Sequence, residues 1–120
     1  ATFRVIIPSM KTLKFTENLV PLVLSGKKYT TWRLFDDKNL QEGDEIDFVN
    51  ASTAEKFAHA YITKVIEKPM SDVKDEDFEG HEKYDSNEQM YKTYSDYYHQ
   101  PVGPDTVVKI IWFELIDHAK

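Results

Sequence analysis

The chain has 120 residues, of which 41% are hydrophobic and 13% aromatic, so it holds enough apolar side chains for one core and is too short for two ordinary domains. The absence of cysteine excludes disulfide frameworks and thiolate metal sites, and no apolar run is long enough to span a membrane. The first residues lack the pattern of a secretory signal, which favours a cytoplasmic protein. The formal net charge of −6 argues against nonspecific nucleic-acid binding, because a polyanion would be repelled.

The N-terminal part of the chain predicts short strands around one helix. Residues 1–8 form an edge strand or an arm that Pro8 closes, and residues 11–15 alternate like a half-buried strand. Thr16 is placed to cap a helix that ends near Gly26. The expected apolar side of this helix consists of Leu19, Val20, Val23 and Leu24.

The stretch after Gly26 concentrates cationic, hydroxyl and aromatic side chains. Residues 29–34 have the aromatic and β-branched content of a strand. Because side chains alternate along a strand, Tyr29, Thr31 and Arg33 are expected on one face. The opposite face is expected to carry Thr30, Trp32 and Leu34. One face therefore combines a hydroxyl with a guanidinium.

The middle of the chain predicts a loop followed by a β-hairpin. Residues 35–44 are rich in turn formers, and Gly43 with Asp44 is expected to reverse the chain. Residues 45–50 and 56–66 then form the two arms. In the second arm, alternation places Phe57, His59, Tyr61, Thr63 and Val65 on one face. Ala58, Ala60, Ile62 and Ile66 are expected on the other.

The C-terminal half predicts an acidic segment, a helix and a final strand. Residues 71–80 are expected to be a solvated loop or to hold one helical turn. Ser86 begins a capping box with Gln89, and residues 106–116 form a strand buried on both faces. The helix between them carries a stripe that is expected to pack in the core, namely Met90, Tyr91, Tyr94, Tyr97 and Tyr98.

This order of elements predicts a single α+β domain over residues 1–120. It contains too few helices for a doubly wound sheet. A small, strongly bent β-barrel of mostly antiparallel strands with two or three flanking helices fits the pattern best.

Two motifs resemble the signature of the ASCH domain family. The first runs from Ser25 to Arg33 and reads G-x-K-x-x-T-x-R, and the second runs from Leu40 to Phe48, with a Gly-Asp pair opening a strand. The similarity covers residues 11–116. It implies the PUA-like β-barrel.

The resemblance implies two kinds of function. Some family members are RNA-binding or coactivator modules, and small bacterial members are amidohydrolases that remove the acyl group from N4-acetylcytidine. By similarity, Lys28 and Thr31 match the catalytic lysine and threonine, and Arg33 matches the arginine of the motif. Glu82 is the expected catalytic glutamate, with Glu79 and Glu88 as alternatives.

These residue types suit amide hydrolysis without a metal or a cofactor. Thr31 would be the nucleophile and Lys28 its base, which requires desolvation or the nearby Arg33 to lower the lysine pKa. Glu82 would orient Lys28 or pass a proton to the leaving amine, although its charge opposes that lowering. Strict alternation puts Lys28 and Thr31 on opposite faces, so we expect Lys28 in the turn before the strand.

Other candidates have structural as well as functional interpretations. Tyr29, Trp32 and Tyr61 are candidates for stacking on a pyrimidine, although barrel aromatics more often pack. Arg33 either binds substrate or pairs with a carboxylate such as Glu45. The four histidines are His59, His81, His99 and His118, and they lack the spacing of a metal site. They are expected to be structural or surface residues. His59, on a polar strand face, is the strongest candidate among them for another role.

The sequence thus favours an amidohydrolase acting on a small modified nucleoside. The alternative is a non-catalytic RNA- or nucleotide-binding module in which Lys27, Lys28 and Arg33 hold phosphate. Nuclease activity is a third possibility, but the sequence offers no general acid and base for it with better claims than Lys28, Thr31 and Glu82. No membrane partner is expected, and the oligomeric state and acyl preference stay open.

Overall fold

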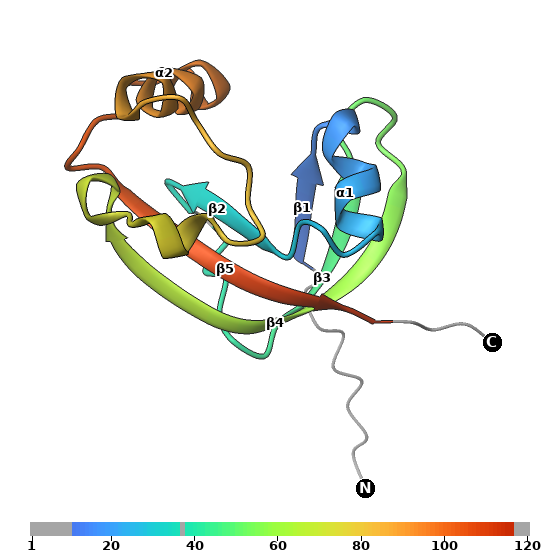
Figure 1. Ribbon diagram of the computed structural model, residues 1–120. Helices are drawn as coiled ribbons and strands as arrows, with labels where there is room; N and C mark the ends of the chain where they lie inside the picture. Colours follow the sequence, from blue (N-terminus) through green and yellow to red (C-terminus); the bar gives the residue numbers. More distant parts are fainter. Residues whose placement is uncertain (1–10, 37, 117–120) are drawn as a thin grey trace, which may run out of the picture.

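One curled five-stranded sheet forms the centre of the protein. The structure, a computed structural model, describes residues 11–36 and 38–116. The strands are β1 (Lys11–Phe15), β2 (Thr30–Leu34), β3 (Glu45–Asn50), β4 (Lys56–Pro69) and β5 (Val107–Leu115). Their order is β1-β3-β4-β5-β2, with β1 parallel to β3 and the other neighbours antiparallel. This half-barrel confirms the predicted α+β barrel class (Figure 1), while the arm predicted for residues 1–8 lies outside the described residues.

Two irregularities in β4 bend the sheet and change which side chains enter the core. The register with β5 shifts between Ile62 and Lys64, and the register with β3 shifts opposite Phe48 and Val49. An extra residue reverses the alternation of all residues beyond it. Val65 therefore packs in the same cluster as Ile62, whereas strict alternation had placed it on the opposite face.

The first helical segment is shorter than expected. A 3-10 turn (Glu17–Leu19) leads into α1 (Val20–Leu24). Thr16 precedes this segment but does not cap it, because its hydroxyl donates to the Asn18 side chain instead. With only about one turn of α-helix, Val23 is buried but Leu24 is 53% exposed, so the predicted apolar side was partly wrong.

The acidic segment and the helix after it cover one end of the half-barrel. The segment holds two 3-10 turns (Met70–Asp72 and Asp75–Phe78), and α2 spans Asn87–Tyr98. The Ser86 hydroxyl accepts a hydrogen bond from the Gln89 amide, as the capping box predicts. The Gln89 side chain reaches one residue further back than expected and accepts from the Asp85 amide.

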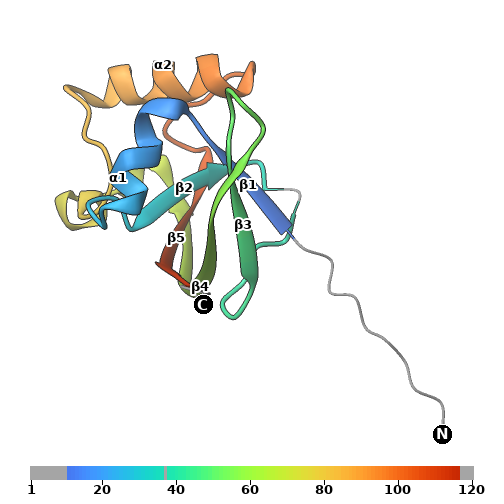
Figure 2. The same ribbon diagram turned by 90° about the vertical axis from the view of Figure 1, so that its right-hand side faces the viewer.

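The core consists of two clusters on opposite faces of β5. Ile111 belongs to the cluster with Phe15 and Phe48, and Ile110 belongs to the cluster beneath α2 with Met90. Both isoleucines are fully buried, so the centre of β5 is buried on both faces as predicted. Because β1 and β2 are the two edges of the sheet, the barrel stays open between them. Figures 1 and 2 show α1 and α2 near this open end.

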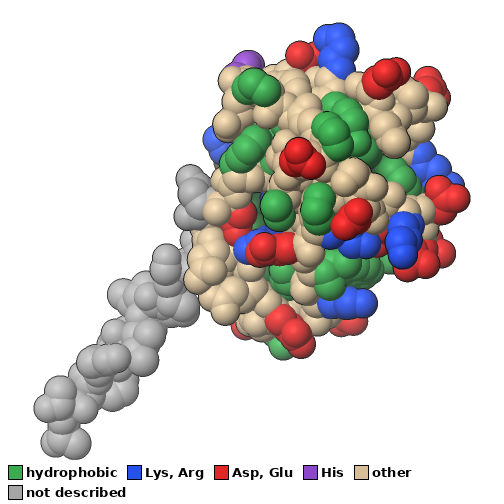
Figure 3. Space-filling view, turned by 90° about the vertical axis from the view of Figure 1, so that its left-hand side faces the viewer, with side chains coloured by type: hydrophobic (Ala, Val, Ile, Leu, Met, Phe, Trp, Pro, Cys, Tyr) green, Lys and Arg blue, Asp and Glu red, His purple; other side chains and the backbone are tan. Residues whose placement is uncertain are grey.

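Positive and negative side chains are intermixed on one face of the protein (Figure 3). Figure 3 shows one face on which Lys and Arg alternate with Asp and Glu, with hydrophobic side chains between them. Within the described residues, no helix is both long and apolar enough to cross a membrane.

Candidate active site

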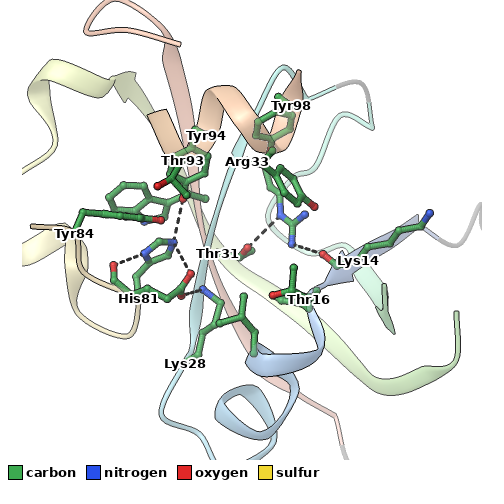
Figure 4. A pocket seen from close by; sticks show the side chains of 15 residues that line it. Lys14, Thr16, Lys28, Thr31, Arg33, His81, Tyr84, Thr93, Tyr94 and Tyr98 are labelled. Atoms are coloured by element: carbon green, nitrogen blue, oxygen red, sulfur yellow. Dashed lines mark hydrogen bonds and ion pairs between the residues drawn. The ribbon is translucent and has the colours of Figure 1, made fainter. Parts of the chain in front are cut away.

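A pocket of about 170 Å³ lies in the open side of the half-barrel. Figure 4 shows its side chains converging from β1, the turn before β2, β2 itself, the segment before α2, and α2. The volume is below the roughly 300–1,000 Å³ of pockets that enclose a drug-sized ligand, so it suits one ring with a small substituent. The titratable groups of the pocket are Lys28, Arg33, His81, Glu82, Tyr84, Tyr94, Tyr97, Tyr98 and, at the rim, Lys14.

Lys28 lies in the turn before β2, where the sequence argument required it. The strand begins at Thr30, and the Lys28 amide donates to the Leu22 carbonyl at 3.0 Å, which ties the turn to α1. Lys28 and Thr31 both line the pocket, and the Lys28 side chain is only 4% exposed. The turn therefore removes the conflict with strand alternation.

Gly80 brings the acidic segment against the start of β2. Its carbonyl accepts from the amides of Tyr29 and Thr30, at 3.0 and 3.2 Å. The Tyr29 ring lies on the glycine so closely that an added Cβ would be 2.6 Å from a ring carbon, and the glycine φ is +76°. Only glycine suits both conditions, because it has no Cβ and adopts positive φ without strain. This contact places the following residues in the pocket.

Glu82 meets Lys28 across the pocket. Its Oε2 accepts from the lysine Nζ at 2.5 Å. The other two glutamates considered from the sequence, Glu79 and Glu88, are exposed and do not line the pocket. Among these three, Glu82 alone is in position to act with Lys28.

The protonation of this pair is asymmetric. Burial has the largest effect on the pKa of Lys28 and lowers it; the Glu82 carboxylate raises this pKa, Arg33 lowers it slightly, and the net result is a lowered pKa. Burial alone would raise the pKa of Glu82, but the neighbouring His81 and Lys28 hold that pKa below its ordinary value. Glu82 is therefore ionised near neutral pH, while Lys28 loses its proton more readily than a surface lysine does.

Arg33 holds the Thr31 hydroxyl and links the two edges of the sheet. Its Nε donates to Thr31 Oγ1 at 3.1 Å, and a terminal nitrogen donates to the Lys14 carbonyl of β1 at 3.1 Å. The guanidinium also lies 5.0 Å from the centre of the Phe15 ring. No carboxylate of the described residues is within 4.0 Å of it, so the suggested pair with Glu45 is not formed.

His81 belongs to the pocket, although its sequence position indicated only a structural or surface residue. Its Nδ1 lies 2.8 Å from the Glu82 carbonyl, and its ring stacks on Trp32 at 4.2 Å and 18°. Burial, reinforced by the nearby Lys28 charge, lowers the pKa of His81 to about 4. The adjacent Glu82 was the only sequence signal that pointed to this residue.

The aromatic residues of the pocket differ from those expected. Trp32 lines it, but the residue is only 3% exposed and its ring is already stacked on His81. Its indole N–H has no hydrogen-bond partner among the described residues. Tyr29 and Tyr61 lie outside the pocket. Phe15, Tyr84 and three tyrosines of the α2 stripe also line it, so the stripe serves both the core and the pocket; the three tyrosines are Tyr94, Tyr97 and Tyr98.

The remaining histidines are separate from the pocket. His59 lies between Glu45 and Asp47, with 2.8 Å contacts to both, and the bond to Glu45 leads the effects that raise its pKa. His99 ends α2 in a left-handed conformation, and His118 lies outside the described residues. No group of three or more His, Asp or Glu suited to a metal ion occurs in the described part of the chain.

Comparison with known proteins agrees with this architecture. The chain resembles the crystal structure of a protein from Enterococcus faecalis at 20% identity and a TM-score of 0.76, covering 94% of this chain and 84% of that one. It resembles an ASCH domain from Lactobacillus crispatus at 15% identity and a TM-score of 0.68, covering 89% and 79%.

A further likeness, to ASCH from Zymomonas mobilis, has 14% identity, a TM-score of 0.61 and coverage of 89% and 66%. At these identities the likenesses show the fold alone. No curated protein matches the sequence. The family model described as "ASCH domain" matches residues 6–117, nearly the whole chain. The chain therefore belongs to the ASCH domain family, with its PUA-like fold.

Proposed function

We propose that this protein is an amidohydrolase that deacylates N4-acetylcytidine or a related N4-acylated cytosine nucleoside. The observation that carries the proposal is the meeting of Lys28, Thr31, Arg33 and Glu82 in one pocket. Together they provide a hydroxyl, a buried amine with a lowered pKa, a cation and a carboxylate. Amide hydrolysis requires a nucleophile, a base and stabilisation of an oxyanion, and these groups supply all three.

In the proposed mechanism, Thr31 attacks the acyl carbonyl. Neutral Lys28 accepts the hydroxyl proton as Oγ1 bonds to the carbonyl carbon, and the carbonyl oxygen becomes an oxyanion. The Arg33 guanidinium already donates a hydrogen bond to Oγ1, and its positive charge stabilises the negative charge that develops nearby. Lys28 then returns the proton to N4 as the C–N bond breaks and cytidine leaves. Water hydrolyses the threonyl ester with Lys28 again as base.

Glu82 has an orienting role in this scheme. Its carboxylate holds the Lys28 side chain, which otherwise has several rotatable bonds, in a single position. The charge of Glu82 favours protonated Lys28, but burial has the larger effect. A bound substrate excludes more water and would lower the lysine pKa further.

Absorbance-monitored turnover of N4-acetylcytidine tests the proposal. We expect turnover by the native protein and its loss in Thr31→Val, which keeps the side-chain shape but removes the hydroxyl. Thr30→Val is the matched control, because Thr30 is the neighbouring buried threonine of β2, its hydroxyl has no hydrogen-bond partner among the described residues, and it does not line the pocket. Folding of each variant is checked by circular dichroism. Absence of turnover by the native protein on N4-acetyl and longer N4-acyl substrates would refute the proposal.

The RNA-binding alternative finds less support in the geometry. Of its three cations, Lys28 is buried against Glu82, and Arg33 is committed to Thr31 and the Lys14 carbonyl. Charges of both signs are intermixed on the face in Figure 3, without a basic stripe. RNA affinity that falls steeply with salt, without nucleoside turnover, would instead support this alternative.

A further inference from the structure

We propose that His81 orients the substrate by accepting a hydrogen bond at Nε2 from the N–H of the scissile amide. This inference rests on the proposed function and adds a residue that recognises the amide N–H of the substrate. It would make the pocket selective for secondary amides, which carry an N–H, over tertiary amides, which do not.

The backbone decides which nitrogen of His81 carries the proton. Nδ1 lies 2.8 Å from the Glu82 carbonyl oxygen, and a carbonyl only accepts hydrogen bonds. Nδ1 must therefore be protonated and donate. In the neutral ring this leaves Nε2 as an acceptor with a lone pair.

The position of Nε2 is fixed, but this nitrogen accepts only one long hydrogen bond within the described residues. The nearest donor that it meets is the Tyr94 hydroxyl at 3.4 Å, longer than an ordinary hydrogen bond. The Glu82 Oε1 atom, at 3.9 Å, is a carboxylate oxygen and has no proton to donate. The His81 side chain is 2% exposed, and stacking on Trp32 fixes its ring plane. An acceptor with a fixed direction thus lies in the pocket wall beside Lys28 (Figure 4).

The surroundings keep this acceptor available near neutral pH. Burial and the charge of Lys28 lower the pKa of His81 to about 4, so the ring stays neutral where the proposed reaction runs. An N4-acylated cytosine carries one proton on its exocyclic nitrogen, while N3, O2 and the acyl oxygen accept. Nε2 therefore matches the N–H and fixes the plane of the amide relative to Thr31.

Two substitutions separate this role from simple support of Glu82. Asparagine can retain a donor near the Nδ1 position but has no acceptor near Nε2, so His81→Asn keeps the bond to the Glu82 carbonyl. Glutamine places an amide oxygen near Nε2 and loses the Nδ1 donor. We expect His81→Asn to lower kcat/KM for N4-acetylcytidine about 10–100-fold and His81→Gln to retain more activity. The reverse order would overturn the inference, because it would show that His81 acts only through Glu82.

A spectroscopic readout does not depend on turnover. With 15N-labelled histidine, we expect cytidine to shift the Nε2 resonance of His81 while Nδ1 stays protonated. N4,N4-dimethylcytidine has no N4–H and is expected to leave that resonance in place. Equal shifts by both ligands, or none by either, would overturn the inference.

The two proposals fail in distinguishable ways. If the native protein turns over substrate but His81→Asn is as active as native, the function stands and the His81 role is wrong. If nothing is turned over but cytidine alone shifts Nε2, the hydrolase proposal is wrong and the His81 contact stands. If neither turnover nor the Nε2 shift occurs, both are wrong.

Discussion

Two shielded lysine–carboxylate pairs, Lys109–Asp36 and Lys28–Glu82, differ in their surroundings. Lys109 contacts Asp36 at 2.7 Å and also donates to the Leu40 carbonyl at 3.0 Å. Asp36 in turn accepts from backbone amides of the loop it holds. Lys28 has one hydrogen-bond acceptor among the described residues, the Glu82 carboxylate. The Lys109–Asp36 pair thus has several further hydrogen-bond partners, whereas Lys28 has no acceptor other than Glu82 among the described residues.

This difference indicates what each pair is for. Asp36 and Lys109 are 9% and 12% exposed, and the acceptors around Lys109 compensate its burial. Lys28 is 4% exposed, yet Glu82 beside the pocket is 33% exposed. A buried amine with few partners favours its neutral form, which is what a base needs. We therefore interpret the Lys109 pair as a structural link and the Lys28 pair as part of the chemistry.

The largest expected effect is on activity. Lys28→Met should lower kcat on N4-acetylcytidine by about 10³-fold or more, because the base is lost. Lys109→Met should stay within about threefold of native when assayed at a temperature at which circular dichroism shows it folded. Equal losses in the two folded variants would remove the functional distinction between the pairs.

Stability should show the opposite order. Lys109→Met leaves the Asp36 carboxylate buried without its cation and should lower the free energy of unfolding by about 3 kcal/mol. Lys28→Met removes a poorly compensated buried charge and leaves Glu82 partly in water, so a change within about 1 kcal/mol is expected. Urea unfolding measures both. A larger loss for Lys28→Met would mean that this pair, too, mainly supports the fold.

Gly80→Ala tests how the Lys28 pair is assembled. The added methyl group meets the Tyr29 ring, and positive φ disfavours alanine, so we expect a loss of about 1–2 kcal/mol in unfolding free energy. Displacement of Glu82 should also lower kcat about tenfold. Gly43→Ala is the control, since that glycine also has positive φ, has open space for an added Cβ and does not line the pocket. It should lose stability without losing kcat in the folded protein.

The smallest expected effect is a shift in the pH at which activity rises, and it should occur for the Lys28 pair but not for the Lys109 pair. Activity should rise with pH until Lys28 is neutral, with an apparent pKa below that of a free lysine. Glu82 raises the Lys28 pKa, so Glu82→Gln should move this rise to lower pH, although the maximum rate falls. Asp36→Asn should leave the position of the rise unchanged. A profile that Glu82→Gln does not move would contradict Lys28 as the base.

Local patterns in the sequence determined the framework of the protein. Alternation located the strand around Leu13, the Ser86 cap located α2, and the motif around Gly26 indicated both the family and the pocket residues Lys28, Thr31 and Arg33. These signals depend on neighbouring residues, because strand period, helix caps and turns are set within a few positions.

The tertiary structure decided which distant side chains complete the site. The family resemblance favoured Glu82 over Glu79 and Glu88, but only the contact between Gly80 and Tyr29 brings Glu82 to Lys28, from which it is 54 residues distant in the chain. The same contact brought His81 into the pocket, while the extra residue in β4 overrode the alternation that had assigned Val65. Such long-range contacts depend on how the strands close around the core, and no local pattern encodes that closure.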